Sequence, residues 1–157
     1  AGASPARIAA PGTLDGGDVM AVGETVYVGL GARTNAEGAR QLAELLAPAG
    51  LSVVTVPIDR VLHLKSAVTA LPDGAVIGWA QALDDTSVFG DFLNAPEARG
   101  AHVVKLGGDA LLMAAGAPRT AALLAARGYR PVEVEIGEFE KLEGCVTCLS
   151  IRLRPAA

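Results

Sequence analysis

Three side chains in this sequence have the types that nucleophilic catalysis by a thiol requires. They are a thiol at Cys148, an imidazole at His63 and a carboxylate at Asp15. A thiol becomes a strong nucleophile when a neighbouring base or positive charge favours the thiolate. Histidine transfers protons near neutral pH, and a carboxylate can orient the imidazole or bind a cationic ligand. The alternative interpretation is a half-exposed structural cysteine and a surface histidine.

A second cysteine, Cys145, forms a C-x-x-C pair with Cys148. Such a pair is typical of a redox couple or of half a zinc site. From Cys148 to Leu153 polar and apolar residues alternate, which predicts a strand with Cys148 on its polar face. Positions three apart in a strand face opposite sides, so this geometry would separate the sulfurs. Without a second C-x-x-C, and with neither histidine at zinc-finger spacing, we predict no metal site and a packing role for Cys145.

Three further residues have both a functional and a structural interpretation. Asp18 follows Asp15 across two glycines, where an aspartate more commonly stabilises a turn than binds a ligand. Arg33 is either a solvated arginine or a planar fork that recognises a substrate carboxylate. Lys65, two residues after His63, is expected to be solvated or to pair locally.

Length and composition indicate one folded domain with a small charged ligand. The chain has 157 residues, of which 51% are hydrophobic and 19% charged, with a net charge of −4. This charge argues against a nucleic-acid surface and is compatible with a cationic ligand. No apolar run is long enough for a membrane span, and the first residues lack the apolar core of a signal peptide. Two cysteines without an export signal favour the reducing cytoplasm.

The first half of the chain predicts a loop, a hairpin and a helix that leads to a strand. Residues 1–13 are expected to form a lead-in loop. The predicted strands are 19–22, 25–30 and 53–58, of which the first two form a hairpin. Thr34 and Glu37 have the spacing of a capping box, so a helix should begin there and end near Gly50.

The second half predicts two more hairpins and a second helix. The predicted strands are 67–71, 75–79, 101–106, 110–114 and 132–136, and residues 138–142 are expected to form a short turn. Pro118 suits the first turn of a helix that runs to about Arg127. Residues 81–98 give the weakest pattern and are predicted as a short helix with loops.

An internal repeat relates the two helical segments. Residues 43–50 match residues 121–128, and a predicted strand follows each of them. Repeated supersecondary units often pack around an axis. His63 follows the first unit and Cys148 follows the second, so both side chains are expected to face one centre.

Together these motifs resemble dimethylarginine dimethylaminohydrolase, within the guanidino-group-modifying enzymes that also include arginine deiminase. The matching stretches occur in the family's order: Leu14-Asp15-Gly16-Gly17-Asp18-Val19, Val28-Gly29-Leu30-Gly31-Ala32-Arg33-Thr34-Asn35, Leu62-His63-Leu64-Lys65-Ser66 and Glu143-Gly144-Cys145-Val146-Thr147-Cys148-Leu149-Ser150. The resemblance implies an α/β pentein fold, a propeller of five ββαβ-type modules. This chain would hold about three of them, approximately residues 14–61, 62–107 and 108–157.

The resemblance also implies roles for individual residues. Cys148 would be the nucleophile, His63 the general acid and base, and Asp15 the carboxylate of the triad. Arg33 would hold the α-carboxylate of the substrate, and Leu142 would offer a backbone carbonyl. Asp18 is a further candidate for substrate binding.

The implied reaction is hydrolysis of Nω-methylated arginine to citrulline and a methylamine through a covalent thiouronium on Cys148. No cofactor or metal is expected. The expected partners are a small cationic guanidino substrate and either an N-terminal part of the same protein or a second copy, with no nucleic acid and no membrane. In the family the N-terminal part carries acidic residues that bind the guanidinium and α-amino groups.

Two alternatives remain open. The first is an arginine deiminase, although deiminases typically have His-x-Asp and Lys65 stands where that aspartate would be. The second is a non-catalytic binding module with the pentein frame.

Overall fold

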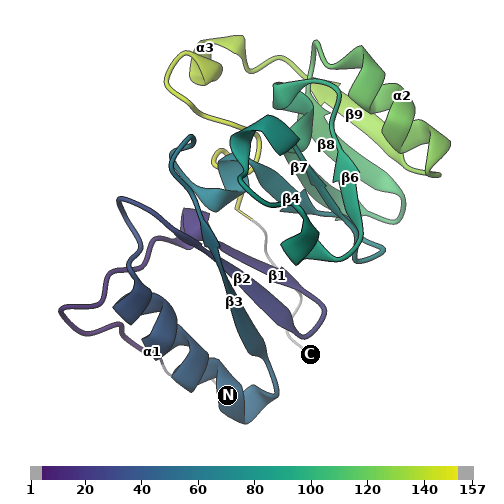
Figure 1. The fold of residues 1–157 in the computed structure, drawn as a ribbon. Coiled ribbons are helices and arrows are strands. Elements are labelled where there is room, and N and C mark those ends of the chain that lie inside the picture. The colour runs from purple at the N-terminus through teal and green to yellow at the C-terminus, as the bar shows by residue number, and fades with distance from the viewer. Residues whose placement is uncertain (1–4, 152–157) are drawn as a thin grey trace.

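The structure, a computed structural model, describes residues 5–151 of the chain. Its strands form three small sheets with one topology (Figure 1). In each sheet the first two strands pair antiparallel as a hairpin, and the third strand pairs parallel to the second. This threefold recurrence confirms the predicted repeat and the α/β class.

The first sheet contains β1 (Val19–Val22), β2 (Thr25–Leu30) and β3 (Ser52–Pro57). The two hairpin strands have the predicted bounds. A parallel third strand requires a crossover connection, which α1 (Ala36–Leu46) supplies. Buried Val26, Val28 and Ala39 pack α1 against this sheet.

The predicted capping box of α1 is wrong. Asn35 is the N-cap, and its side chain accepts a hydrogen bond from the backbone N–H of Gly38 at 2.8 Å. The carboxylate of Glu37 binds Arg40 and Gln41 on the helix surface instead. Thr34 therefore does not cap the helix. Its hydroxyl is buried and donates a hydrogen bond to Asp18.

The second sheet contains β4 (Val68–Ala70), β5 (Val76–Gly78) and β6 (Phe92–Asn94). Its crossover has short 3-10 turns at Ala80–Ala82 and Ser87–Phe89 in place of an α-helix. The sequence prediction of a short helix with loops missed β6. A strand of three residues is too short to show a period, so its pairing with β5 decides its conformation.

The third sheet contains β7 (Val103–Gly107), β8 (Ala110–Ala114) and β9 (Arg130–Val134), with α2 (Pro118–Ala126) as the crossover. The short helix α3 (Gly137–Glu140) follows. The predicted module boundary at residue 107 falls inside the β7–β8 hairpin. The sheet pairing therefore places the start of this unit near Val103.

The first strands of the three sheets lie next to one another. Strand β1 contacts β4, and β4 contacts β7. Residues of all three strands line a cavity of about 390 Å³, to which Lys65, Thr147 and Ser150 also contribute. Apolar clusters fill the space between adjacent sheets, such as Met20, Tyr27 and Val68 between the first two. The hairpins thus surround a common centre, as the repeat predicted.

The predicted strand at Cys148 is wrong. Residues 146–149 form turns, and Ser150 and Ile151 have no regular structure. The backbone N–H of Leu149 donates to the carbonyl of Cys145 at 3.1 Å, which is the spacing of a helical turn. The rest of the predicted strand, Arg152 and Leu153, lies outside the described residues.

Candidate active site

One cavity of about 240 Å³ brings together the three residues predicted for catalysis. Asp15, His63 and Cys148 line it, along with Gly17, Lys65, Ser66 and Thr147. The carboxylate comes from the loop before β1, the imidazole from the loop after β3, and the thiol from the segment after α3. The first two loops flank the first sheet, and the third follows the third sheet.

Asp15 is oriented by its own turn. Its Oδ1 accepts a hydrogen bond from the backbone N–H of Gly17 at 2.8 Å, and it lies 3.3 Å from Nε2 of His63. The Gly17 hydrogen bond lowers the pKa of Asp15, and the nearby His63 and Arg33 act in the same direction against the opposing effect of partial burial. Asp15 is therefore ionised at neutral pH and can stabilise an imidazolium at His63.

Arg33 lies beside the same histidine nitrogen. Its Nη1 is 3.3 Å from Nε2 of His63. A guanidinium only donates hydrogen bonds, so Nε2 must be unprotonated to accept from Arg33 and protonated to donate to Asp15. Whether Nε2 carries a proton thus decides which of these two partners it can hydrogen-bond.

The position of His63 depends on a close contact with glycine. A Cβ at Gly17 would lie 2.6 Å from Cγ of the His63 ring, so only glycine leaves room for the imidazole here. The His63 side chain is 12% exposed and precedes a 3-10 turn, Leu64–Ser66, in which Leu64 is fully buried. The turn and the glycine together restrict the ring.

Asp18 is fully buried and holds three segments of the site together. Its Oδ2 accepts a hydrogen bond from the Thr34 hydroxyl at 2.6 Å, and its Oδ1 accepts from the backbone N–H of Leu64 at 3.0 Å. The Thr34 oxygen in turn accepts from the backbone N–H of Asp15 at 3.0 Å. This Asp18–Thr34 network fixes the backbone at Asp15 and the backbone just after His63.

The predicted substrate role of Asp18 is therefore replaced by a positioning role. Both of its oxygens have protein donors, and the side chain has no exposed surface. The structural alternative, a carboxylate that stabilises its surroundings, fits this position. Leu142 is 85% exposed and does not line the cavity of the three catalytic candidates.

The turn at the C-terminal segment brings the two cysteine sulfurs within 3.2 Å of each other. Residues three apart in a helical turn share a face, whereas the expected strand would have separated them. Cys145 is buried, as its predicted packing role requires, and Cys148 is exposed. The predicted separation of the two sulfurs was wrong because it assumed a strand, whereas the segment forms a helical turn.

The environment of Cys148 favours its thiolate. Partial removal from water raises the pKa of this thiol. Hydrogen bonding at Cys145 and Thr147 and the charge of Lys65 outweigh that effect, so the pKa falls below its ordinary value. Burial raises the pKa of the Cys145 thiol instead. The exposed cysteine is thus the one of the pair that ionises more readily.

The cysteine segment is anchored on both sides. Val146 is buried with Val104, Ala114 and Ile136 on the third sheet. Upstream, Glu143 adopts a left-handed backbone with φ of 59°, and the N–H of Gly144 donates to the carbonyl of Phe139 at 2.9 Å. These bonds end α3 in a Schellman-type turn and direct the chain back toward the site.

Several contributors were not recognised from the sequence. Lys65 was expected to be solvated or to pair locally, and it lines the cavity and lowers the pKa of the Cys148 thiol. Thr147 lies with its hydroxyl 2.9 Å from the Cys145 sulfur, and Thr34 was assigned to a helix cap. Two of these residues could have been found from the sequence, because Lys65 is close to His63 and Thr147 directly precedes Cys148.

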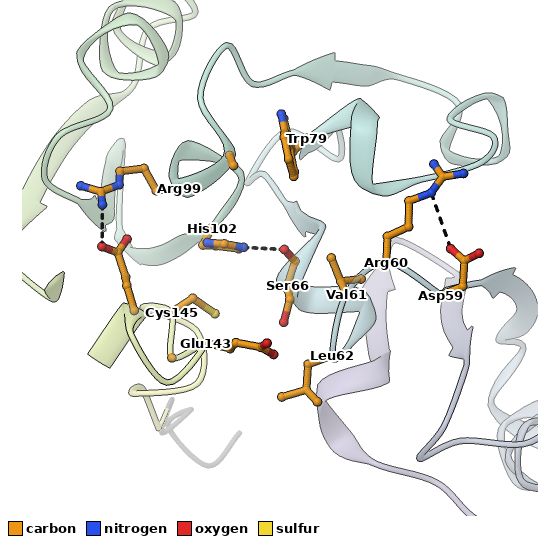
Figure 2. Close-up of a pocket in the computed structure, with 13 residues that line it drawn as sticks. Asp59, Arg60, Val61, Leu62, Ser66, Trp79, Arg99, His102, Glu143 and Cys145 are labelled. Atoms are coloured by element: carbon orange, nitrogen blue, oxygen red, sulfur yellow. Dashed lines mark hydrogen bonds and ion pairs between the residues drawn. The ribbon is translucent and has the colours of Figure 1, made fainter. Parts of the chain in front are cut away.

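Cys145 also lines a larger cavity of about 630 Å³, which Cys148 does not line. Figure 2 shows Cys145 and Glu143 facing Ser66 and His102. Arg99 and Glu140, which line the same cavity, form an ion pair of 2.8 Å. Burial lowers the pKa of His102, whose Nε2 is 2.7 Å from the Ser66 carbonyl oxygen. Within residues 5–151, no cluster of three or more histidine, cysteine or acidic side chains could hold a metal ion.

Thr34→Val should destabilise the protein by about 1–3 kcal/mol, because it leaves Asp18 Oδ2 and the Asp15 N–H without their partner. Urea denaturation monitored by circular dichroism measures this loss. Thr34→Ser keeps the hydroxyl and serves as the control. A Val variant as stable as the Ser variant would contradict the importance of the network.

Comparisons with known proteins find relatives over most of the chain. A family model described as arginine deiminase matches residues 5–112. A dimethylarginine dimethylaminohydrolase of Streptomyces coelicolor is 65% identical over 144 residues, which cover 92% of this chain and 56% of that protein. Its Pseudomonas aeruginosa counterpart is 36% identical over 158 residues, covering 93% of this chain and 58% of that protein.

A solved structure shows the same fold. The structure of the Pseudomonas aeruginosa enzyme in complex with citrulline matches with a TM-score of 0.83 at 37% identity, and covers 94% of this chain and 58% of that chain. The chain thus spans little more than half the length of these relatives. Since the family match extends over most of the chain, this protein belongs to the arginine deiminase family of guanidino-group-modifying pentein proteins and resembles its dimethylarginine dimethylaminohydrolases.

Proposed function

We propose that this chain carries the nucleophile and proton-transfer residues of an enzyme that hydrolyses Nω-methylated arginine to citrulline and methylamine or dimethylamine. The observation that carries the proposal is the single cavity lined by Cys148, His63 and Asp15. The 65% identity to a dimethylarginine dimethylaminohydrolase supports the choice of substrate class.

Cys148 begins the proposed reaction. Its thiolate attacks the guanidinium carbon, and an S–C bond forms to give a tetrahedral adduct. His63 protonates the substituted nitrogen, the C–N bond breaks, and the amine leaves. The product of this step is a thiouronium on Cys148.

Water completes the reaction. His63, neutral after giving up its proton, takes a proton from a water molecule that attacks the same carbon. The C–S bond then breaks, citrulline leaves, and the Cys148 thiolate is restored. Asp15, 3.3 Å from Nε2 of His63, stabilises the imidazolium whenever it forms.

Arg33 is proposed to bind the α-carboxylate of the substrate. Its guanidinium is exposed and lies 3.3 Å from His63, which places a carboxylate-binding fork at the edge of the site. Leu142 is proposed to offer its backbone carbonyl to the substrate. Because the chain spans 56% of its Streptomyces relative, we propose that additional residues of the complete site come from a further part of the protein or from a second copy.

Arginine deiminase activity is the second candidate, since the matching family model carries that description. The two activities differ in the amine that is released. Dimethylarginine yields dimethylamine, whereas arginine yields ammonia.

The test is a citrulline assay on the purified protein with dimethylarginine and arginine as separate substrates, combined with intact-mass measurement of every polypeptide present. We expect a higher kcat/KM for dimethylarginine. A higher kcat/KM for arginine would favour the deiminase. Absence of citrulline from both substrates in protein with a reactive Cys148 would overturn both proposals in favour of a binding module.

Cys148→Ser should lower kcat by roughly 10⁴-fold or more, since a serine hydroxyl without a depressed pKa is a poor nucleophile here. Cys145→Ser is the matched control in the same turn. Its effect should be small because the serine hydroxyl keeps a hydrogen-bond donor beside Cys148. Citrulline formation under substrate saturation gives both values. A Cys148→Ser enzyme with wild-type turnover would refute the nucleophile assignment.

Gly17→Ala should lower kcat by about 10²-fold, because the new methyl group displaces the His63 ring. The backbone N–H that binds Asp15 is retained, so the effect isolates the position of the imidazole. Gly16→Ala is the control, since a Cβ there meets no atom within 4 Å. Equal kcat values for the two variants would contradict the proposed packing of His63.

Alkylation by iodoacetamide should distinguish the two thiols by pH. Because the pKa of Cys148 is lowered, its thiolate persists to lower pH, and its alkylation midpoint should lie below that of an ordinary thiol. The raised pKa of Cys145 predicts a midpoint above that of an ordinary thiol. Peptide mapping after timed alkylation across pH measures both, and the reverse order would contradict the assignment.

A further inference from the structure

The C-x-x-C pair has the geometry of a dithiol rather than of two independent cysteines. The Cys145 and Cys148 sulfurs are 3.2 Å apart, and a disulfide bond is about 2.05 Å long. Closing this distance requires a movement of about 1 Å. The turn that holds Cys148 is exposed on the Leu149 side and is followed by irregular chain, so it can accommodate such a movement.

The two thiols differ in exposure, as a pair needs in which a peroxide oxidises one thiol and the other then reacts with it. Cys148 is exposed on the cavity that contains His63, so a small oxidant reaches it first. Cys145 is 3% exposed and lines the larger cavity (Figure 2), which Cys148 does not line. The Thr147 hydroxyl, 2.9 Å from the Cys145 sulfur, can donate a hydrogen bond to the thiolate that Cys145 must form to react.

We propose that Cys145 is a resolving thiol for Cys148, and that a hydroperoxide converts the pair into a reversible disulfide. That the disulfide switches off catalysis rests on the proposed function of Cys148. Formation of the disulfide does not depend on that function, because it requires only the two sulfurs and the oxidant.

The chemistry proceeds in two balanced steps. The Cys148 thiolate attacks one peroxide oxygen, the O–O bond breaks, and the leaving oxygen departs as hydroxide or alkoxide while sulfur is oxidised to the sulfenic acid. The Cys145 sulfur then attacks the Cys148 sulfur. An S–S bond forms, the S–O bond breaks, and hydroxide leaves with the Cys145 proton as water. A thiol reductant restores both cysteines by exchange through a mixed disulfide.

The disulfide would protect Cys148 from irreversible oxidation while it prevents catalysis. A sulfenic acid without a nearby thiol is oxidised further to the irreversible sulfinic acid. Cys145 is near enough to intercept the sulfenic acid, so the nucleophile is stored as a disulfide instead. Val146, buried between the two cysteines in sequence, keeps the Cys145 side of the turn anchored while Cys148 moves.

The test treats the purified protein with hydrogen peroxide, alkylates the remaining thiols, and measures intact mass and peptide maps without any substrate. Wild-type protein should lose two hydrogen atoms, resist alkylation at both cysteines, and regain both thiols with dithiothreitol. The Cys145→Ser variant should instead gain oxygen atoms at Cys148 that dithiothreitol does not remove. Turnover of dimethylarginine should recover with the reductant in the wild type alone.

Oxygen uptake at Cys148 of the wild type at the rate of the Cys145→Ser variant would overturn the proposal. So would a disulfide that joins two chains, or equal rates of disulfide formation in folded and urea-unfolded protein. The mass measurement separates this proposal from the enzymatic one. A disulfide in a protein without citrulline activity would refute only the proposed function, whereas activity without the disulfide would refute only the resolving role.

Discussion

The buried carboxylate of Asp18 is the interaction on which the arrangement of the site depends. A charge without contact with water must be satisfied by protein donors, and here the donors come from Thr34 and from the backbone of Leu64. These donors belong to segments that lie before α1 and after β3. Satisfying one buried charge therefore sets the separation between the loop that carries Asp15 and the loop that carries His63.

The three sheets supply the rigid frame around that network. Their first strands lie side by side and line a common cavity, while apolar clusters fill the spaces between neighbouring sheets. The candidate catalytic residues lie on the loops and turns that this frame holds. Loops positioned by a rigid scaffold often carry chemistry, because the scaffold limits how far they move.

The helical turn at Cys145 and Cys148 affects both the ionisation of Cys148 and its oxidation. A helical turn directs Cys148 to the cavity and places the Cys145 sulfur against it. Hydrogen bonding at Cys145 is among the causes that favour the Cys148 thiolate. A thiolate that is readily formed is also readily oxidised, so the neighbour that assists the nucleophile is well placed to intercept its oxidation product.

Local sequence patterns determined the hairpin strands, both long helices and the internal repeat, because these features depend on neighbouring residues and recognisable motifs. The motifs also indicated Cys148, His63 and Asp15 as the catalytic candidates. Only the tertiary structure decided the burial of Asp18, the strand β6 and the proximity of the cysteine sulfurs. Each depends on partners distant in sequence or on a backbone conformation that alternation alone misjudges. The apolar residues after Cys148 resembled a strand, but the bond from Leu149 to Cys145 and the burial of Val146 favour a helical turn.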